Sequence, residues 1–252
     1  MKRILWAILA LVTSANAAYS QTCWTIGTDG SIELNPERIV LPYSDHIEMS
    51  GEQVSCVLRW MVDEKGLFGQ ERSLVFPMLR RVPNDTHASL LYRMGTDVMS
   101  LVGINSLVPK QLSTKKVSID GGLSVISEYG VGKANVGGAR GDYTRPVAEV
   151  SQTIFPSRTL PMVCEIYVLR NISDKPLTVS VPEFSQVVRT LAGEGLDGSY
   201  VIRADIFGSG TYVLAPRNEI RFHAAFQAYR ADTERMIVPD IDAEYSARMS
   251  FI

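Results

Sequence analysis

Cysteine and histidine are scarce in this sequence, which has three of each in 252 residues. Three cysteines are too few for the disulfide framework of a small secreted domain, and no two stand at the paired spacing of a zinc site. The histidines are also far apart, so the sequence has no His-based metal motif and no evident base to activate a nucleophile. We therefore expect no metal, no cofactor and no thiol chemistry.

The cysteines leave one structural alternative open. Cys56 and Cys164 each lie among aliphatic residues in a strand-like stretch, whereas Cys23 lies near the N-terminus. An odd count allows at most one intramolecular pair. Cys56 and Cys164 are therefore either two small buried hydrophobic residues or the two halves of one disulfide.

An excess of one charge sign is absent too. The formal net charge is −2, from 25 basic and 27 acidic residues that are mixed along the chain. This balance gives no electrostatic attraction to nucleic acid or to anionic lipid, so neither is an expected partner.

Long hydrophobic runs are missing after the N-terminus. No later stretch approaches the roughly 20 apolar residues that a membrane-spanning helix needs. The first residues follow a different pattern: Lys2 and Arg3 precede the apolar run 4–12, and Ala15-Asn16-Ala17 has the small-x-small form of a cleavage site. Residues 1–17 are predicted to be a signal peptide, and the mature protein is expected in the periplasm or outside the cell after cleavage near Ala17.

Motifs for nucleophilic catalysis and for phosphate binding are absent as well. No Gly-x-Ser-x-Gly elbow occurs. The glycine-rich stretch 130–145 lacks the glycine and hydroxyl positions of a P-loop, and it lacks the third glycine of a dinucleotide fingerprint. It is either a long connection at one end of a β domain or a loop whose Arg140, Tyr143 and Arg145 line a ligand cleft.

What the chain does contain is strand-like alternation along most of its length. The clearest stretch is 160–182, where residues 162–170 and 177–181 alternate on either side of a turn-rich segment, and this pattern predicts a β-hairpin. Residues 162–170 are apolar on both faces, which is typical of a strand inside a large sheet.

Further alternating stretches extend the same prediction. Residues 53–62 and 70–78 flank the turn 63–66, and residues 116–119 and 123–129 flank the reversal at 120–122. In 219–229, Ile220, Phe222 and Phe226 are predicted to face inward, with a wet face opposite. Shorter strands are predicted at 31–35, 38–41, 47–49, 90–94, 98–104, 147–155, 186–191, 200–207 and 211–214. About fifteen strands without an internal helix predict an all-β fold, a large antiparallel two-sheet sandwich.

The spacing of apolar residues changes from strand-like to helical only at the end of the chain. Asp242 is a candidate cap for a helix in which Ile241, Tyr245 and Met249 recur at helical spacing, and Glu244 can pair with Arg248. A helix this short is marginal alone, so its apolar stripe is expected to need partners that the sequence lacks. The expected organisation is a signal peptide at 1–17, a β-sandwich at 18–238, and the start of a linker helix at 239–252.

Two runs and the central stretch resemble a known family. IEMSGEQVSCVLRW at 47–60 and RSLVFPMLRRVPNDTHASL at 72–90 resemble the N-terminal region of bacterial six-hairpin glycosidases of the Bacteroidetes type, and YVLRNISDKPLTVSVP at 167–182 is similar to their β-supersandwich. The resemblance covers most of 32–252. It implies a supersandwich that precedes a linker helix and a catalytic (α/α)6 toroid of helices, and the sequence departs from the family because it ends where that toroid is expected.

The expected function follows from this resemblance. The chain is expected to be a non-catalytic sandwich module of an exported glycoside hydrolase, with hydrolysis only where a helical catalytic domain is supplied. Glycoside hydrolysis needs two positioned carboxylates, and 27 scattered acids single out no pair, so no catalytic residue is assigned. Six residues in irregular polar stretches are candidates for contact with a carbohydrate: Arg80, Asn84, His87, Arg140, Tyr143 and Arg145.

The alternative is a free-standing exported carbohydrate-binding module. Such a module needs exposed aromatic platforms on which sugar rings stack. The mature sequence offers only Trp24 and Trp60 as tryptophans, and the alternation around Trp60 predicts that it faces inward. An aromatic-lined groove would favour this alternative, and a large exposed apolar patch on one sheet would favour the packing module.

Overall fold

The computed structural model describes residues 23–82, 88–132 and 145–251, and these contain 16 strands, two short 3-10 helices and the helix α2. The strands in the first half are β1 (Trp24–Ile26), β2 (Ile32–Leu34), β3 (Tyr43–Ser50), β4 (Ser55–Val62), β5 (Phe68–Arg80), β6 (Ser89–Met94), β7 (Gly103–Ile104) and β8 (Lys110–Ile119). Those in the second half are β9 (Leu123–Gly130), β10 (Pro146–Pro156), β11 (Met162–Asn171), β12 (Leu177–Val181), β13 (Ser185–Arg189), β14 (Tyr200–Phe207), β15 (Gly210–Leu214) and β16 (Glu219–Arg230). Helix α2 spans Ile241–Met249.

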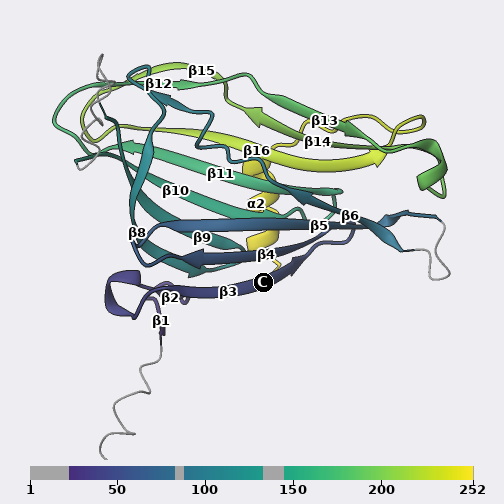
Figure 1. The fold of residues 1–252 in the computed structure, drawn as a ribbon, viewed down its shortest axis with the longest axis horizontal. Coiled ribbons are helices and arrows are strands. Elements are labelled where there is room, and N and C mark those ends of the chain that lie inside the picture. The colour runs from purple at the N-terminus through teal and green to yellow at the C-terminus, as the bar shows by residue number, and fades with distance from the viewer. Residues whose placement is uncertain (1–22, 83–87, 133–144, 252) are drawn as a thin grey trace, which may run out of the picture.

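The strands form one large sheet and two smaller ones. The large sheet has nine strands in the order β1-β2-β8-β9-β10-β11-β16-β14-β13. The smaller sheets have the orders β3-β4-β5-β6 and β15-β12-β7, and in Figure 1 β4 and β5 run in front of the large sheet. The predicted all-β, antiparallel sandwich is confirmed, since the paired strands run antiparallel, but the described strands form three sheets where the sequence predicts two.

The central stretch is partly as predicted. Strand β11 lies inside the large sheet between β10 and β16, and its residues from Met162 to Tyr167 are buried on both faces. The predicted hairpin with 177–181 is wrong, since β12 pairs with β15 and β7 in another sheet. The segment after β11 therefore crosses from one layer to the other.

Two predicted hairpins are confirmed. Strands β4 and β5 pair through the turn at Asp63, whose carbonyl accepts a hydrogen bond from the Gly66 amide (2.9 Å). Strands β8 and β9 pair on either side of Gly121, which has a φ of +64° that favours glycine.

Two predicted strands are replaced by other local structure. Part of 38–41 is taken up by a 3-10 helix, Pro36–Arg38, because proline suits a first helical turn and the Asn35 side chain caps it by accepting from the Glu37 amide (2.9 Å). Of 98–104 only Gly103–Ile104 is a strand. The residues before it turn, and Asp97 accepts from the Met99 amide (3.1 Å).

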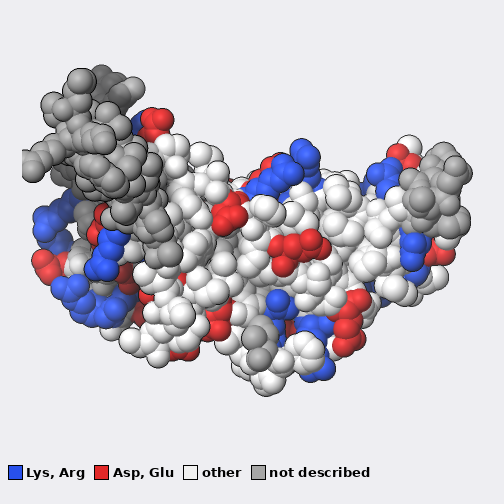
Figure 2. Space-filling model, turned by 90° about the horizontal axis from the view of Figure 1, so that it is seen from below, with Lys and Arg blue, Asp and Glu red and all other residues white. Residues whose placement is uncertain are grey.

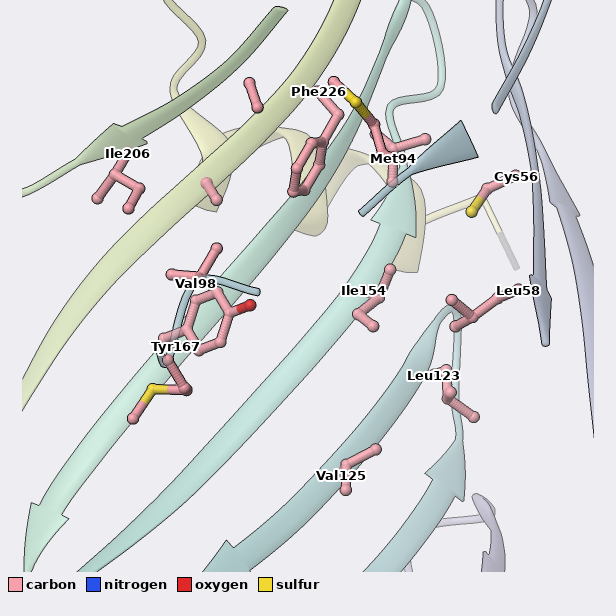
Figure 3. Packing of buried hydrophobic residues seen from close by; sticks show 14 of the residues in the cluster. Cys56, Leu58, Met94, Val98, Leu123, Val125, Ile154, Tyr167, Ile206 and Phe226 are labelled. Carbon is pink, nitrogen blue, oxygen red and sulfur yellow. The ribbon is translucent and has the colours of Figure 1, made fainter. Parts of the chain in front are cut away.

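The main hydrophobic core lies between the large sheet and the smaller sheets. Figure 3 shows side chains that meet there, Phe226, Tyr167 and Ile154 from the large sheet with Leu58 and Cys56 from β4. All five are buried, and burying one large aliphatic or aromatic side chain contributes about 1.5–3 kcal/mol. The inward positions predicted for 219–229 belong to this core.

A second, smaller core lies on the opposite face of the large sheet, beneath α2. Phe155, Met162, Cys164 and Ala225 are buried there around Ile241, the first residue of α2. The face of 219–229 that the sequence predicts to be solvent-exposed is therefore buried at Ala225, because α2 covers it.

The two cores settle the question of the cysteines. Cys56 lies in the main core and Cys164 in the second core, on opposite faces of the large sheet, so they cannot approach each other. Both are buried thiols rather than a disulfide. Burial raises the pKa of Cys56 to about 12, so this thiol is inert as a nucleophile.

Helix α2 differs from its prediction in its contacts. Its cap is Asp240, whose carboxylate accepts from the Ala243 amide (3.1 Å), whereas Asp242 forms an ion pair with Arg221 of β16 and lies 3.3 Å from His223 Nε2. The expectation that the apolar stripe lacks partners is wrong. Ile241 is buried and the Tyr245 ring lies 5.1 Å from that of Phe155.

The predicted pairing of Glu244 with Arg248 is also wrong, because each side chain fastens α2 to the sandwich. Glu244 accepts a hydrogen bond from the Ser157 hydroxyl. The Arg248 guanidinium donates to the carbonyls of Gly121 and Ser50. Helix α2 is thus an integral part of this domain.

We predict that Ile241→Ala loosens α2 without unfolding the sandwich. Truncating a buried isoleucine costs about 2–5 kcal/mol, and here the loss falls on the docking of one terminal helix. Hydrogen exchange should accelerate more than tenfold for the α2 amides and change little in β16. Ala247→Ser, on the exposed face of α2, is the matched control and should leave both rates unchanged. Equal acceleration in α2 and β16 would contradict separate docking.

The surface carries mixed charge. Figure 2 shows acidic and basic side chains interspersed over the face seen from below, and neither sign forms a continuous block. Within the described ranges, no helix is long and apolar enough to cross a membrane.

Candidate functional site: a polar cavity between the sheets

The six residues predicted from the sequence do not form one site in the described part of the chain. Asn84, His87, Arg140 and Tyr143 lie outside the described residues. Arg80 and Arg145 are both exposed. Arg80 ends β5 near Arg230, at the end of the sandwich where β10 finishes, whereas Arg145 lies just before β10 begins. The two arginines therefore lie at opposite ends of the strands.

The structure instead brings together a charged pair that sequence reasoning missed. Arg72 on β5 and Glu165 on β11 both point into the space between the sheets, where the Arg72 Nε donates to Glu165 Oε1. The side chains are only 3% and 0% exposed, respectively. Two opposite charges so deeply buried are tolerated only where their other polar atoms are also satisfied.

Further hydrogen bonds hold both members of this pair. Glu165 Oε2 accepts from the Tyr167 hydroxyl and from Gln152 Nε2 (3.1 Å), and Gln152 Nε2 also lies 2.8 Å from the Tyr167 oxygen. Arg72 donates through a terminal nitrogen to the Thr96 carbonyl (2.9 Å). The guanidinium also lies over the Phe226 ring, 4.9 Å from its centroid.

The electrostatics of the cluster follow from burial and from the pair itself. Burial opposes the charge on Arg72, but the attraction and hydrogen bond of Glu165 together with the electrostatics of Tyr167 and Cys56 outweigh it, so the pKa of the guanidinium is raised. Burial, reinforced by the charge of Glu165, raises the pKa of Tyr167 well above its ordinary value. Tyr167 therefore remains a neutral hydrogen-bond donor, and the cluster fastens the two layers together.

A cavity of about 340 Å³ adjoins this cluster. Its floor is buried and includes Tyr167, Val150 and Ser127. Its rim is exposed and is formed by residues of β5 and β6 and of the loop that follows β6. The rim residues are Gly69, Glu71, Arg93, Gly95 and Asp97.

The carboxylates at the rim are already engaged. Glu71 forms an ion pair with Arg93 (3.6 Å), and Asp97 accepts from the Met99 amide (3.1 Å). Glu165, deeper in, has hydrogen bonds to both of its oxygens. Glycoside hydrolysis needs a proton-donating acid opposite a second available carboxylate. Among the described residues, the carboxylates in or beside the cavity are those of Glu71, Asp97 and Glu165, and each has a protein partner.

The tryptophans do not form a sugar-stacking platform. Trp60 is 3% exposed, as predicted, and its ring stacks on that of Phe68 with 6.1 Å between centroids. Trp24 meets Trp60 edge-on at 6.0 Å and donates from Nε1 to the Tyr43 hydroxyl (3.0 Å). These rings are packed against one another, so the surface-platform type of carbohydrate-binding module is not supported at either tryptophan.

One feature of the sequence could have identified Arg72 and Glu165 as buried charges. Arg72 is in phase with Leu74 and Phe76 on β5, and Glu165 is in phase with Val163 and Tyr167 on β11. A charged residue at an inward position of an alternating strand implies a buried partner. Alternation alone does not say which partner, because the two residues are 93 positions apart.

In the three described segments, no group of three or more His, Cys, Asp or Glu side chains is arranged to hold a metal ion. The chain matches no protein-family model and no curated protein at a significant level.

Proposed function

We propose that this chain is a non-catalytic β-sandwich module of an exported glycoside hydrolase and packs against a helical catalytic domain. The main support for the proposal is that the buried acids form ion pairs with neighbouring arginines. Glu165 and Asp205, the two buried carboxylates of the described residues, are held in ion pairs with Arg72 and Arg203. A sandwich that uses its interior acids for internal cohesion is suited to support rather than to chemistry.

Helix α2 supports the packing part of the proposal. Its inner side is fastened to the large sheet, and its outer side exposes small residues at positions i, i+3, i+4 and i+7. These are Ala243, Ser246, Ala247 and Ser250. A face of small side chains lets a second helix approach closely. Val238, before the helix, and Phe251, after it, are also exposed.

We predict that purified residues 18–252 hydrolyse no glycoside. The test is an assay against aryl glycosides and plant and host oligosaccharides, with reducing-sugar and chromatographic detection. A commercial glycosidase serves as the positive control. Hydrolysis that is abolished by replacing one acid of this chain, such as Glu71→Gln or Asp97→Asn, would overturn the non-catalytic assignment.

The packing part is tested separately from catalysis. The reading frame that follows the codon for Ile252 in the genome is expected to encode helical repeats. Joining that segment to the chain should protect Ala243, Ala247 and their neighbours from hydrogen exchange. An unrelated gene in that position, or unchanged exchange in the joined protein, would contradict the packing role.

A further inference from the structure

We infer that the cavity between the sheets is a binding site for one neutral monosaccharide or a polyol of similar size. This inference goes beyond the packing role proposed above and depends on the cavity alone. Binding and hydrolysis are measured separately, so either proposal can fail without the other.

The first observation is an unpartnered polar atom. Gln70 lines the cavity next to Arg72 on β5, and its Oε1 is buried without a hydrogen-bond partner among the described residues. Leaving a buried acceptor unsatisfied is unfavourable, by about 1–3 kcal/mol. A ligand hydroxyl that donates to Oε1 removes this cost, so the atom favours an occupant that carries O–H groups.

The second observation is the chemistry of the lining. Three glutamine amides, those of Gln70, Gln111 and Gln152, line the same cavity. Hydrogen bonds hold the Gln111 amide to the hydroxyls of Thr114 (3.1 Å) and Ser127 (3.0 Å), and Gln152 is held by Glu165 and Tyr167. Gln111 and Gln152 already use their amide nitrogens on these partners, so the Oε1 of Gln70 is the amide atom of the three that gains a hydrogen bond from a ligand hydroxyl. The apolar parts of Val125 and Val150 and the ring of Tyr129 complete the wall.

The third observation concerns charge and size. Each arginine that lines the cavity is neutralised, Arg72 by Glu165 and Arg93 by Glu71, so the site has no surplus positive charge for an anion. A volume of about 340 Å³ is near the lower end of the range of ligand cavities, roughly 300–1,000 Å³. This size suits one sugar ring, and the exposed rim gives it access from solvent.

The experiment is an NMR titration of purified residues 18–252 with D-glucose, D-galactose, D-mannose, D-xylose and sorbitol. At least one of them is expected to shift the side-chain amide signals of Gln70, Gln111 and Gln152 saturably, with a dissociation constant on the order of 1 mM. Gln70→Leu is expected to weaken that ligand at least tenfold. The same substitution should retain or raise the thermal midpoint, because it removes an unsatisfied buried acceptor.

Gln227→Leu is the matched control. Gln227 is a buried glutamine of the sandwich whose amide is satisfied, because it donates to the Ile237 carbonyl (2.9 Å) and accepts from the Ile237 amide (2.9 Å). Its replacement should lower the thermal midpoint and leave sugar affinity within twofold. The inference is overturned if none of the five compounds shifts the cavity amides, or if Gln70→Leu binds as tightly as the parent. It is also overturned if Gln70→Leu destabilises the fold as Gln227→Leu does, since Gln70 would then be structural.

Discussion

Replacing Arg72 by leucine is expected to lower the free energy of unfolding by about 3–5 kcal/mol, because it leaves Glu165 buried without its cation. The loss also removes the hydrogen bond to the Thr96 carbonyl and the contact with the Phe226 ring. Urea denaturation followed by fluorescence measures the effect as a lower midpoint at an unchanged slope.

The double variant Arg72→Leu/Glu165→Leu distinguishes lost packing from an unpaired charge. Removing both charges should recover much of the stability, since a buried ion pair adds little over apolar side chains of similar volume. Arg217→Leu is a surface comparison, because Arg217 is 64% exposed and lies 3.9 Å from Asp174, and it should have little effect. If the double variant is no more stable than Arg72→Leu, the unpaired charge of Glu165 is not the cause of the destabilisation.

The second large effect is expected from Gly51→Ala, at the junction between β3 and β4. A β-carbon at this position would lie 1.9 Å from the Ser157 carbonyl oxygen, which is backbone and cannot simply rotate away. Overpacking of this kind costs about 1–3 kcal/mol or more. Ser157 also holds Glu244, and the neighbouring Ser50 carbonyl accepts from Arg248, so the shift should loosen α2 as well.

Gly193→Ala is the control for this substitution. A β-carbon on Gly193 meets no atom within 4 Å, so thermal unfolding should change little. Hydrogen exchange should report faster α2 amides in Gly51→Ala and not in Gly193→Ala. A normal thermal midpoint for Gly51→Ala would show that the strand junction has room to move.

Alternation along the sequence predicted most of the strands because the layers of a sandwich sort side chains by polarity. It could not predict which sheet β12 joins. The chain does turn after β11 as the sequence predicts, and there the Asn171 side chain accepts a hydrogen bond from the Ser173 amide (2.9 Å). Asn171 also donates to the carbonyl of Leu214, at the end of β15. That long-range contact fixes where the chain goes next, and no local pattern encodes it.

The site was less predictable than the fold. The sequence predicts contact residues in irregular polar stretches, whereas the structure places its buried polar cluster on regular strands. Arg72 and Glu165 meet from different layers, and only the assembled sandwich brings them together. Likewise, only the folded structure shows that the buried Oε1 of Gln70 lacks a hydrogen-bond partner among the described residues.

Strand β11 is the common wall of both hydrophobic interiors, and this limits how the protein can vary. Cys164 and Ile166 face α2, while Glu165 and Tyr167 face the space between the sheets, so neighbouring residues along one backbone lie in opposite compartments. A bulkier side chain at Cys164 cannot be absorbed by moving the strand, because that movement would displace the carboxylate next to it. Sequence drift in this protein should therefore be slowest along β11 and fastest on strands with one open face, such as β13.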